Sequence, residues 1–187
     1  MMRLFIALPL EKTVEDRLEG IIDSLAQKGG SVKWVKPRNI HLTLRFLGDT
    51  DERLVGRIKT EIDAVAAAHG PVKTAISRLG AFPNLNRPRV IWVGIEERLE
   101  DLRKMARDME LRARTLRFEK ESRAFKAHLT LGRIRNPQGL DELTDYMKDY
   151  ALAEIPVVLD RIVLFKSTLT PQGPIYDRLH EAALSAK

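Results

Sequence analysis

The tetrapeptide His-Leu-Thr-Leu occurs twice in this chain, at residues 41–44 and 128–131. Because side chains alternate between the two faces of a strand, each copy would place its histidine and threonine on one face and its leucines on the other. The leucine face suits a hydrophobic core, whereas the histidine and threonine face suits a cleft. Two such strands side by side would bring an acid and a base that work near neutral pH into one space.

The order strand, helix, strand, helix, strand occurs twice along the chain, which indicates a duplicated half. The first strands of the two halves start at Arg3 and Arg89, 86 residues apart, and His128 follows His41 by 87 residues. An offset shared by the elements and the motif favours two similar lobes related by a pseudo-twofold axis. The predicted fold class is therefore α+β and bilobal, with an antiparallel-rich sheet and flanking helices in each lobe and the active-site cleft between them.

Hydrophobic periodicity and turn residues set the expected element boundaries. Thr13 is the expected N-cap of the first helix, and Asp49 and Glu52 have the spacing of a capping box for the second. Gly48 should end the strand that carries the first motif. Strands are expected at 3–8, 40–47, 72–79, 89–95, 128–134, 155–165 and 175–179, and two further helices at 99–113 and 140–150.

Length and composition favour one soluble domain that spans residues 1–187, because 44% of the residues are hydrophobic and 31% are charged. The absence of cysteine excludes disulfides, thiolate metal sites and cysteine nucleophiles. The apolar run at 4–10 is too short to span a bilayer and lacks the features of a signal peptide, so we expect a cytoplasmic monomer with no membrane partner. The formal net charge of +6 favours an anionic partner, nucleic acid included.

Three uses of the paired histidines compete: two half-buried structural side chains, a metal site, or acid and base catalysis. Zinc or iron normally needs a third protein ligand. Neither motif has an adjacent acid on its histidine face, where the alternate positions hold Thr43, Arg45, Thr130 and Gly132. Arginine repels a cation and attracts an anion, so these residues favour a phosphate site without a metal or another cofactor.

In an in-line displacement at a phosphodiester, one neutral histidine deprotonates the attacking oxygen while the other, as imidazolium, protonates the leaving oxygen. Thr43 and Thr130 can donate hydrogen bonds to the non-bridging oxygens, and arginine can hold the developing charge. Alternation puts Arg45 on the His41 face but Arg133 on the face opposite His128. Arg133 would reach the cleft if the strand bulged near Gly132.

The remaining histidines and aromatic residues have weaker signals. His69 lies where a helix ends and His180 lies near the C-terminus, so both favour capping or surface roles. Five aromatic residues could include a base-stacking platform, although aromatic residues in strands are more typical of a core. These are Trp34, Phe46, Phe82, Trp92 and Phe125.

The paired motifs, with three further segments, resemble the 2H phosphoesterase superfamily. Within it the chain is similar to the bacterial and archaeal RNA 2′,3′-cyclic phosphodiesterases, first called 2′-5′ RNA ligases, over nearly its whole length. The segments that carry the resemblance are His-Leu-Thr-Leu-Arg-Phe-Leu-Gly at 41–48, His-Leu-Thr-Leu-Gly-Arg at 128–133, Arg-Leu-Phe-Ile-Ala-Leu at 3–8, Arg-Pro-Arg-Val at 87–90 and Val-Leu-Phe-Lys-Ser at 163–167.

The resemblance implies a bilobal fold in which one lobe holds both chain ends and the middle of the chain forms the other. It also implies opening of a terminal 2′,3′-cyclic phosphate on RNA, or on a small cyclic nucleotide, to a 2′-phosphomonoester without a metal. By family analogy His41 is the proton donor to the leaving 3′ oxygen and His128 is the proton acceptor that activates water. Arg133 matches an arginine that often lies beside the phosphate. Ala127 departs from the family pattern, in which proline commonly precedes the second histidine.

Two alternatives stay open. The same site could join RNA ends through a 2′-5′ linkage, since only the nucleophile differs, with a 5′-hydroxyl in place of water. The protein could also bind RNA ends without catalysis.

Overall fold

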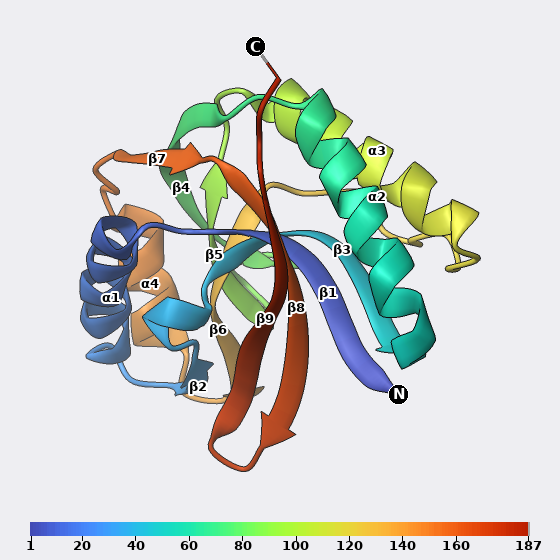
Figure 1. Ribbon diagram of the computed structural model, residues 1–187. Coiled ribbons are helices and arrows are strands. Elements are labelled where there is room, and N and C mark those ends of the chain that lie inside the picture. Colours follow the sequence, from blue (N-terminus) through green and yellow to red (C-terminus); the bar gives the residue numbers. More distant parts are fainter. Residues whose placement is uncertain (187) are drawn as a thin grey trace.

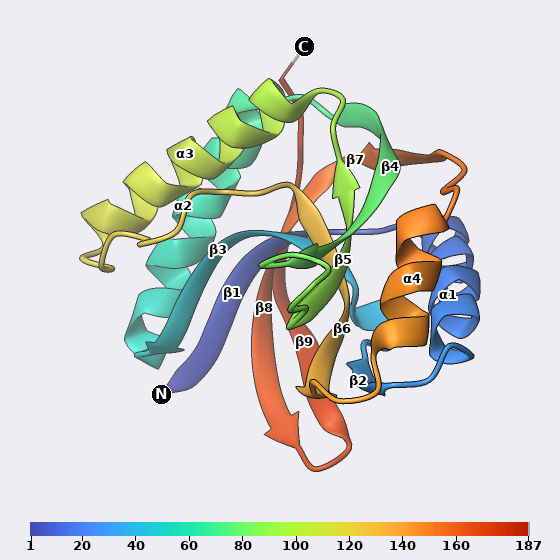
Figure 2. The same ribbon diagram turned by 180° about the vertical axis from the view of Figure 1, so that it is seen from behind.

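The structure is a computed structural model and describes residues 1–186. It contains both helices and strands, arranged as Figures 1 and 2 show. The strands are β1 (Met2–Pro9), β2 (Ser31–Trp34), β3 (His41–Thr50), β4 (Val72–Phe82), β5 (Val90–Ile95), β6 (His128–Asn136), β7 (Ile155–Leu159), β8 (Arg161–Thr170) and β9 (Gly173–Ala183). The helices are α1 (Lys12–Ala26), α2 (Val55–Ala68), α3 (Leu99–Thr115) and α4 (Asp141–Asp149), with 3₁₀ turns η1 (Pro37–Asn39) and η2 (Glu52–Leu54).

The strands form a curled antiparallel sheet in the order β7-β4-β5-β6-β3-β1-β8-β9, with β2 added on β6. Within residues 1–186 the two halves of this sheet join through one register pair between β3 and β6, Leu42 with Leu129. We call β3, β1, β8 and β9 the terminal lobe, because it holds the strands nearest both chain ends, and β6, β5, β4 and β7 the middle lobe. The bilobal α+β prediction is confirmed, and the lobes differ from the halves of the sequence.

Two of the helices, α1 and α3, pack on the lobe other than the one whose strand precedes them in the chain. The α2 and α3 helices pack against each other, and they contact β8, β9 and β3 of the terminal lobe. The α1 and α4 helices pack together on the other side of the molecule, where α1 contacts β7 of the middle lobe (Figure 1). Helix α1 therefore follows a strand of the terminal lobe but covers the middle lobe, and α3 does the reverse.

The leucines of both motifs lie in the core between the sheet and the helices. Leu42, Leu44, Leu129 and Leu131 are buried there with the apolar stripes of the helices. Burying one leucine stabilises a fold by about 1.5–3 kcal/mol. Burial of the leucines therefore determines which face of each motif strand points into the core. A smaller apolar cluster on the terminal lobe comprises Phe5, Ala7, Val163 and Phe165.

Three expected boundaries were wrong, two of them because the pairing of β3 with β1 overrides a local signal. Glu11, not Thr13, is the N-cap of α1, and its side chain makes no capping hydrogen bond. The β3 strand continues past Gly48, which takes a φ of +68°, because β1 pairs with it as far as Thr50. Helical structure therefore starts later than the Asp49 capping box predicted, and the Asp51 side chain accepts the hydrogen bond from the Arg53 amide.

The expected strand at 155–165 is two strands, which belong to different lobes. The apolar run is interrupted at Asp160, where the chain leaves β7 at the edge of the middle lobe and enters β8 of the terminal lobe. β7 pairs with β4, whereas β8 pairs with β1 and β9. Among the helices in residues 1–186, none has the length and apolar character that crossing a bilayer requires.

Candidate active site

The register of β3 and β6 sets the two motifs side by side. Leu42 pairs with Leu129 in antiparallel orientation, so His41 lies across from Thr130 and Thr43 across from His128. Because both leucines point into the core, alternation turns all four polar side chains to the opposite face. The two histidines occupy a cross-strand diagonal, a relation that in antiparallel pairs spans roughly 7–8 Å.

A backbone carbonyl two residues upstream orients each imidazole. The Nδ1 atom of His41 lies 2.7 Å from the Asn39 carbonyl oxygen, and Nδ1 of His128 lies 2.8 Å from that of Lys126. A carbonyl only accepts, so each Nδ1 carries the proton and donates it. Nε2 is therefore the nitrogen that each neutral ring offers for proton transfer.

Aromatic rings pack against both histidines. His41 stacks on Phe5 with ring centroids 4.7 Å apart and meets Tyr176 edge-on at 5.6 Å. His128 meets Phe82 edge-on at 5.0 Å, and Phe82 in turn stacks on Trp92 at 4.9 Å. Of the aromatic residues singled out from the sequence, Phe82 and Trp92 thus lie on the His128 side of the site.

This packing keeps both rings neutral at pH 7. The pKa of His41 is lowered from 6.5 to about 4, because burial, and to a smaller extent the positive charge of His128, outweigh the hydrogen bond to Asn39, which raises it. Burial also lowers the pKa of His128, with smaller contributions from Arg133 and Lys126. An anion held between the rings would favour their charged forms and raise both pKa values.

Both motif strands carry a bulge directly after the threonine and leucine. Alternation breaks where Leu44 and Arg45 are both buried, and the register with β1 shifts there. The same happens at Leu131 and Gly132, where the register with β5 shifts. Residues beyond each bulge therefore point to the face opposite to the one that simple alternation predicts.

The bulge turns Arg45 away from the face of His41, where alternation predicted a phosphate contact, and its side chain is engaged elsewhere. Its side chain is only 7% exposed, and its Nε lies 2.8 Å from Glu110 Oε2 on α3. Its Nη1 lies 3.0 Å from Glu121 Oε2, and its Nη2 donates to the Glu119 carbonyl oxygen. Arg45 thus ties β3 to α3 and to the segment that leads toward the second motif.

The second bulge turns Arg133 to the face of His128. From the sequence, we expected Arg133 to reach the cleft if the strand bulged near Gly132, and the structure has this bulge. Its positive charge contributes to the lowered pKa of His128 and opposes the rise that burial causes in the pKa of Tyr176, which places Arg133 within electrostatic reach of both sides of the site. Phe46 takes the corresponding position after the first bulge and is 58% exposed, with its ring 6.1 Å from that of Phe5.

The far wall of the site, which β8 and β9 supply, was not predicted from the sequence. A cavity of about 480 Å³ lies beside His41 and includes Phe165, Tyr176 and Arg178 in its lining. Lys36 and Arg38, from the basic segment before the first motif, line its other side. The basic residues at 33–38 were a visible signal, whereas nothing in the local sequence marks Tyr176 or Arg178.

The other histidines have structural roles, as expected. His69 is the C-cap residue of α2, is buried, and lies 2.7 Å from Asp108. His180 lies 2.6 Å from Asp63 on α2. The structure places no three His, Asp or Glu side chains of residues 1–186 together as a metal site would need.

The two remaining aromatic candidates lie against the core. Trp34 packs on Gly132, where a Cβ would lie 2.8 Å from the indole ring, so this position suits only glycine without a shift of the ring. Phe125 is partly buried against the main core. Neither lines the cavity beside His41.

Two lobes whose junction sets a pair of His-x-Thr strands side by side form the arrangement of a two-histidine phosphoesterase. The chain belongs to the LigT-like phosphoesterases of the 2H superfamily, because the family model matches it twice, at residues 8–92 and 93–176. The two matches confirm the internal duplication, and their boundary falls within β5.

Relatives match nearly the whole chain. A protein of Archaeoglobus fulgidus named RNA 2′,3′-cyclic phosphodiesterase is 37% identical over 180 residues, which cover 95% of this chain and 98% of the relative. One of the same name from Thermotoga maritima is 34% identical, covering 96% and 94%. Among solved structures, TT0787 of Thermus thermophilus matches with a TM-score of 0.80 at 26% identity and 98% coverage of both chains. E. coli LigT complexed with 3′-AMP shares the fold, with a TM-score of 0.70 at 22% identity and 99% coverage of both chains.

Proposed function

We propose that this protein hydrolyses RNA ends that carry a 2′,3′-cyclic phosphate and releases 2′-phosphomonoester ends. The observation that carries the proposal is the pairing of Leu42 with Leu129, which sets both His-x-Thr faces on one side of the sheet. The names of the Archaeoglobus and Thermotoga relatives support the substrate, and the 3′-AMP bound to E. coli LigT supports a nucleotide site in this fold.

In the proposed reaction, Nε2 of His128 takes a proton from water as the water oxygen attacks phosphorus. The bond from phosphorus to the 3′ oxygen breaks in line, and imidazolium His41 gives its proton to that oxygen. Each transfer is typically worth about 10² to 10⁴ in rate. Thr43 and Thr130 donate hydrogen bonds to the non-bridging oxygens, and Arg133 offsets the charge that develops on them. The two histidines then exchange protons with solvent for the next turnover.

Incubation with a nucleoside 2′,3′-cyclic phosphate in EDTA tests the proposal. We expect a nucleoside 2′-phosphate to accumulate, which phosphorus NMR distinguishes from the 3′ isomer, because the acid, the base and the anion-binding groups are all protein side chains. Activity that required added divalent metal would contradict this chemistry. Tight binding with no turnover would favour a non-catalytic RNA-end binder, and a 2′-5′ linked product with an added 5′-hydroxyl oligonucleotide would favour end joining.

The pH dependence follows from the two lowered pKa values. We expect kcat/KM to fall about tenfold per pH unit above about pH 7, because the reacting form of the free enzyme holds one proton on the histidine pair. Both free histidines titrate below 6.5, so this form becomes scarcer in proportion to proton concentration. Rates measured from pH 6 to 9 at constant ionic strength check this. A flat profile through pH 8.5 would contradict it.

A further inference from the structure

The cavity beside His41 lies on one side of the reaction axis. In the described part of the chain its lining includes His41 and the segment before it, together with the turn between β8 and β9, but no residue of the second motif. The β8–β9 hairpin extends beyond the neighbouring strands in both views (Figures 1 and 2). We call this cavity the hairpin pocket. It gives the two histidines, which are otherwise pseudo-symmetric, unlike surroundings.

The hairpin pocket has an apolar wall and a cationic rim. Phe165, Pro174 and Tyr176 form part of its wall next to the His41 ring. Lys36, Arg38 and Arg178 add three positive charges, against one carboxylate in the lining, that of Glu15. Arg178 also acts on this carboxylate, because its charge lowers the pKa of Glu15, which burial raises. A pocket of this kind suits a nucleoside with a phosphate at its edge.

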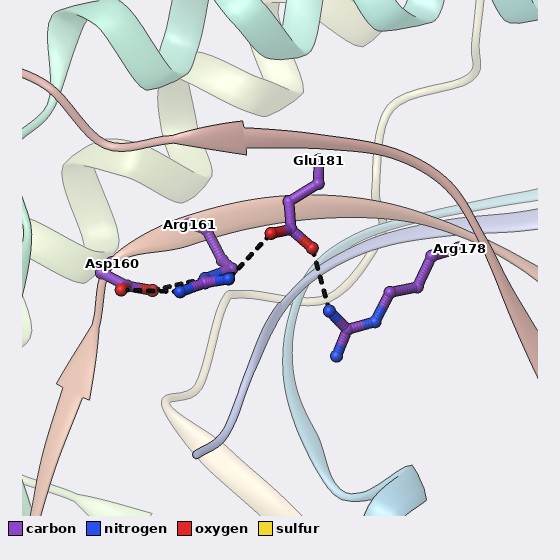
Figure 3. A network of polar contacts seen from close by, with 4 residues as sticks. All are labelled: Asp160, Arg161, Arg178 and Glu181. Carbon is purple, nitrogen blue, oxygen red and sulfur yellow. Dashed lines mark hydrogen bonds and ion pairs between the residues drawn. The ribbon is translucent and has the colours of Figure 1, made fainter.

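A chain of ion pairs holds Arg178 in place (Figure 3). Its Nη1 lies 2.9 Å from Glu181 Oε2, while Oε1 of the same carboxylate lies 2.8 Å from Arg161 Nη1. Asp160 binds Arg161 with both oxygens, at 2.7 and 3.0 Å. Within residues 1–186 only Nη1 of the three Arg178 nitrogens makes a hydrogen bond, so the others remain for a ligand. An arginine fixed in advance loses less conformational entropy on binding a phosphate.

Asn39 couples the pocket to the catalytic ring. Its carbonyl oxygen accepts the hydrogen bond from His41 Nδ1 at 2.7 Å, and its side-chain Nδ2 donates to the Pro174 carbonyl oxygen at 3.1 Å. The hairpin wall and the imidazole therefore share one anchor. A nucleoside seated against the wall would have its ribose next to His41.

We propose that the hairpin pocket binds the nucleotide that carries the cyclic phosphate, and that Lys36, Arg38 and Arg178 bind the phosphodiester on its 5′ side. This inference rests on the proposed function, because in-line attack by water leaves the 3′ oxygen and its ribose on the His41 side. The preferred substrate class is then the end of an RNA strand, which has that phosphodiester, over a free nucleoside cyclic phosphate, which lacks it.

Two substrates that differ only in this group test the proposal: adenosine 2′,3′-cyclic phosphate and the same molecule with a 5′-phosphate. We expect the wild type to favour the 5′-phosphorylated substrate in kcat/KM. Arg178→Ala should lower kcat/KM about tenfold for that substrate, the usual effect of losing one charge-assisted hydrogen bond, and less than about threefold for the other. Glu181→Gln, which keeps Arg178 but loosens it, should give a smaller loss of the same selectivity.

Arg78→Ala is the matched control, because Arg78 is an exposed arginine paired with Glu96 and lies outside the pocket lining. It removes the same charge and should leave the ratio between the two substrates unchanged. Equal losses for both substrates in Arg178→Ala, or a wild type that does not distinguish them, would overturn the pocket assignment while leaving hydrolysis intact. Failure of the wild type to hydrolyse either substrate would instead overturn the proposed function.

Discussion

Substitution of either motif histidine by alanine should lower kcat for a nucleoside 2′,3′-cyclic phosphate by about 10² to 10⁴, the usual value of one positioned acid or base. His41 and His128 act on the same displacement, so the kcat of the double variant should be only slightly lower than the kcat of the less active single variant. Steady-state rates at saturating substrate measure this. His180→Ala is the matched control, because His180 pairs with Asp63 and should keep full activity.

A substrate with a good leaving group separates the two roles. A nucleoside 2′,3′-cyclic phosphate with sulfur in place of the 3′ oxygen expels a thiolate that needs no proton, so His41→Ala should recover most of its rate on it while His128→Ala should not. This outcome follows from His41 as donor and His128 as acceptor. Recovery by the His128 variant would reverse the assignment, and full activity of either variant on the cyclic substrate would defeat the acid and base mechanism.

The second large effect expected is on stability. Arg45→Met should lower the free energy of unfolding by about 3 kcal/mol, because it leaves the largely covered carboxylates of Glu110 and Glu121 without their cation. Urea unfolding measures it. The control Arg103→Met breaks an exposed pair with Glu100 and should cost less than about 1 kcal/mol.

The kinetics of Arg45→Met decide between the two roles considered for this residue. The contacts of Arg45 lie away from the cleft. The KM of the folded variant should therefore stay within about twofold of the wild-type value. Adding Glu110→Gln should restore part of the lost stability, since it removes one of the stranded charges. A raised KM with normal stability would instead reinstate Arg45 as a phosphate ligand.

Much of the site follows from the two motifs alone. Alternation from His41 to Leu44 and from His128 to Leu131 identifies the core face and the cleft face, and the common offset of the motifs indicates the two lobes. The bulges could not be predicted in this way, because the extra residue of a bulge does not show in the alternating pattern of apolar and polar residues. Gly132 gave a hint in the second strand. In the first strand the corresponding residue is Arg45, whose chemistry suggested the opposite.

The hairpin pocket was beyond prediction for a different reason. Tyr176 and Arg178 belong to no motif and lie more than 130 residues from His41 in sequence. They reach it because β8 pairs with β1 and β9 pairs with β8, a register that depends on the whole sheet. The break at Asp160 was hidden similarly, since the strands on either side of it are both buried and together form an almost continuous apolar run.

The exchange of α1 and α3 between the lobes makes the repeat a domain swap inside a single polypeptide. Neither half of the sequence can be cut out as a self-sufficient fragment, because each would leave behind one of the two helices on its side of the sheet. Strain applied to one lobe is carried into the other by a continuous stretch of backbone. The distance between the proton donor and the proton acceptor is therefore set by the shared core of the two lobes. Surface loops can vary without altering this distance.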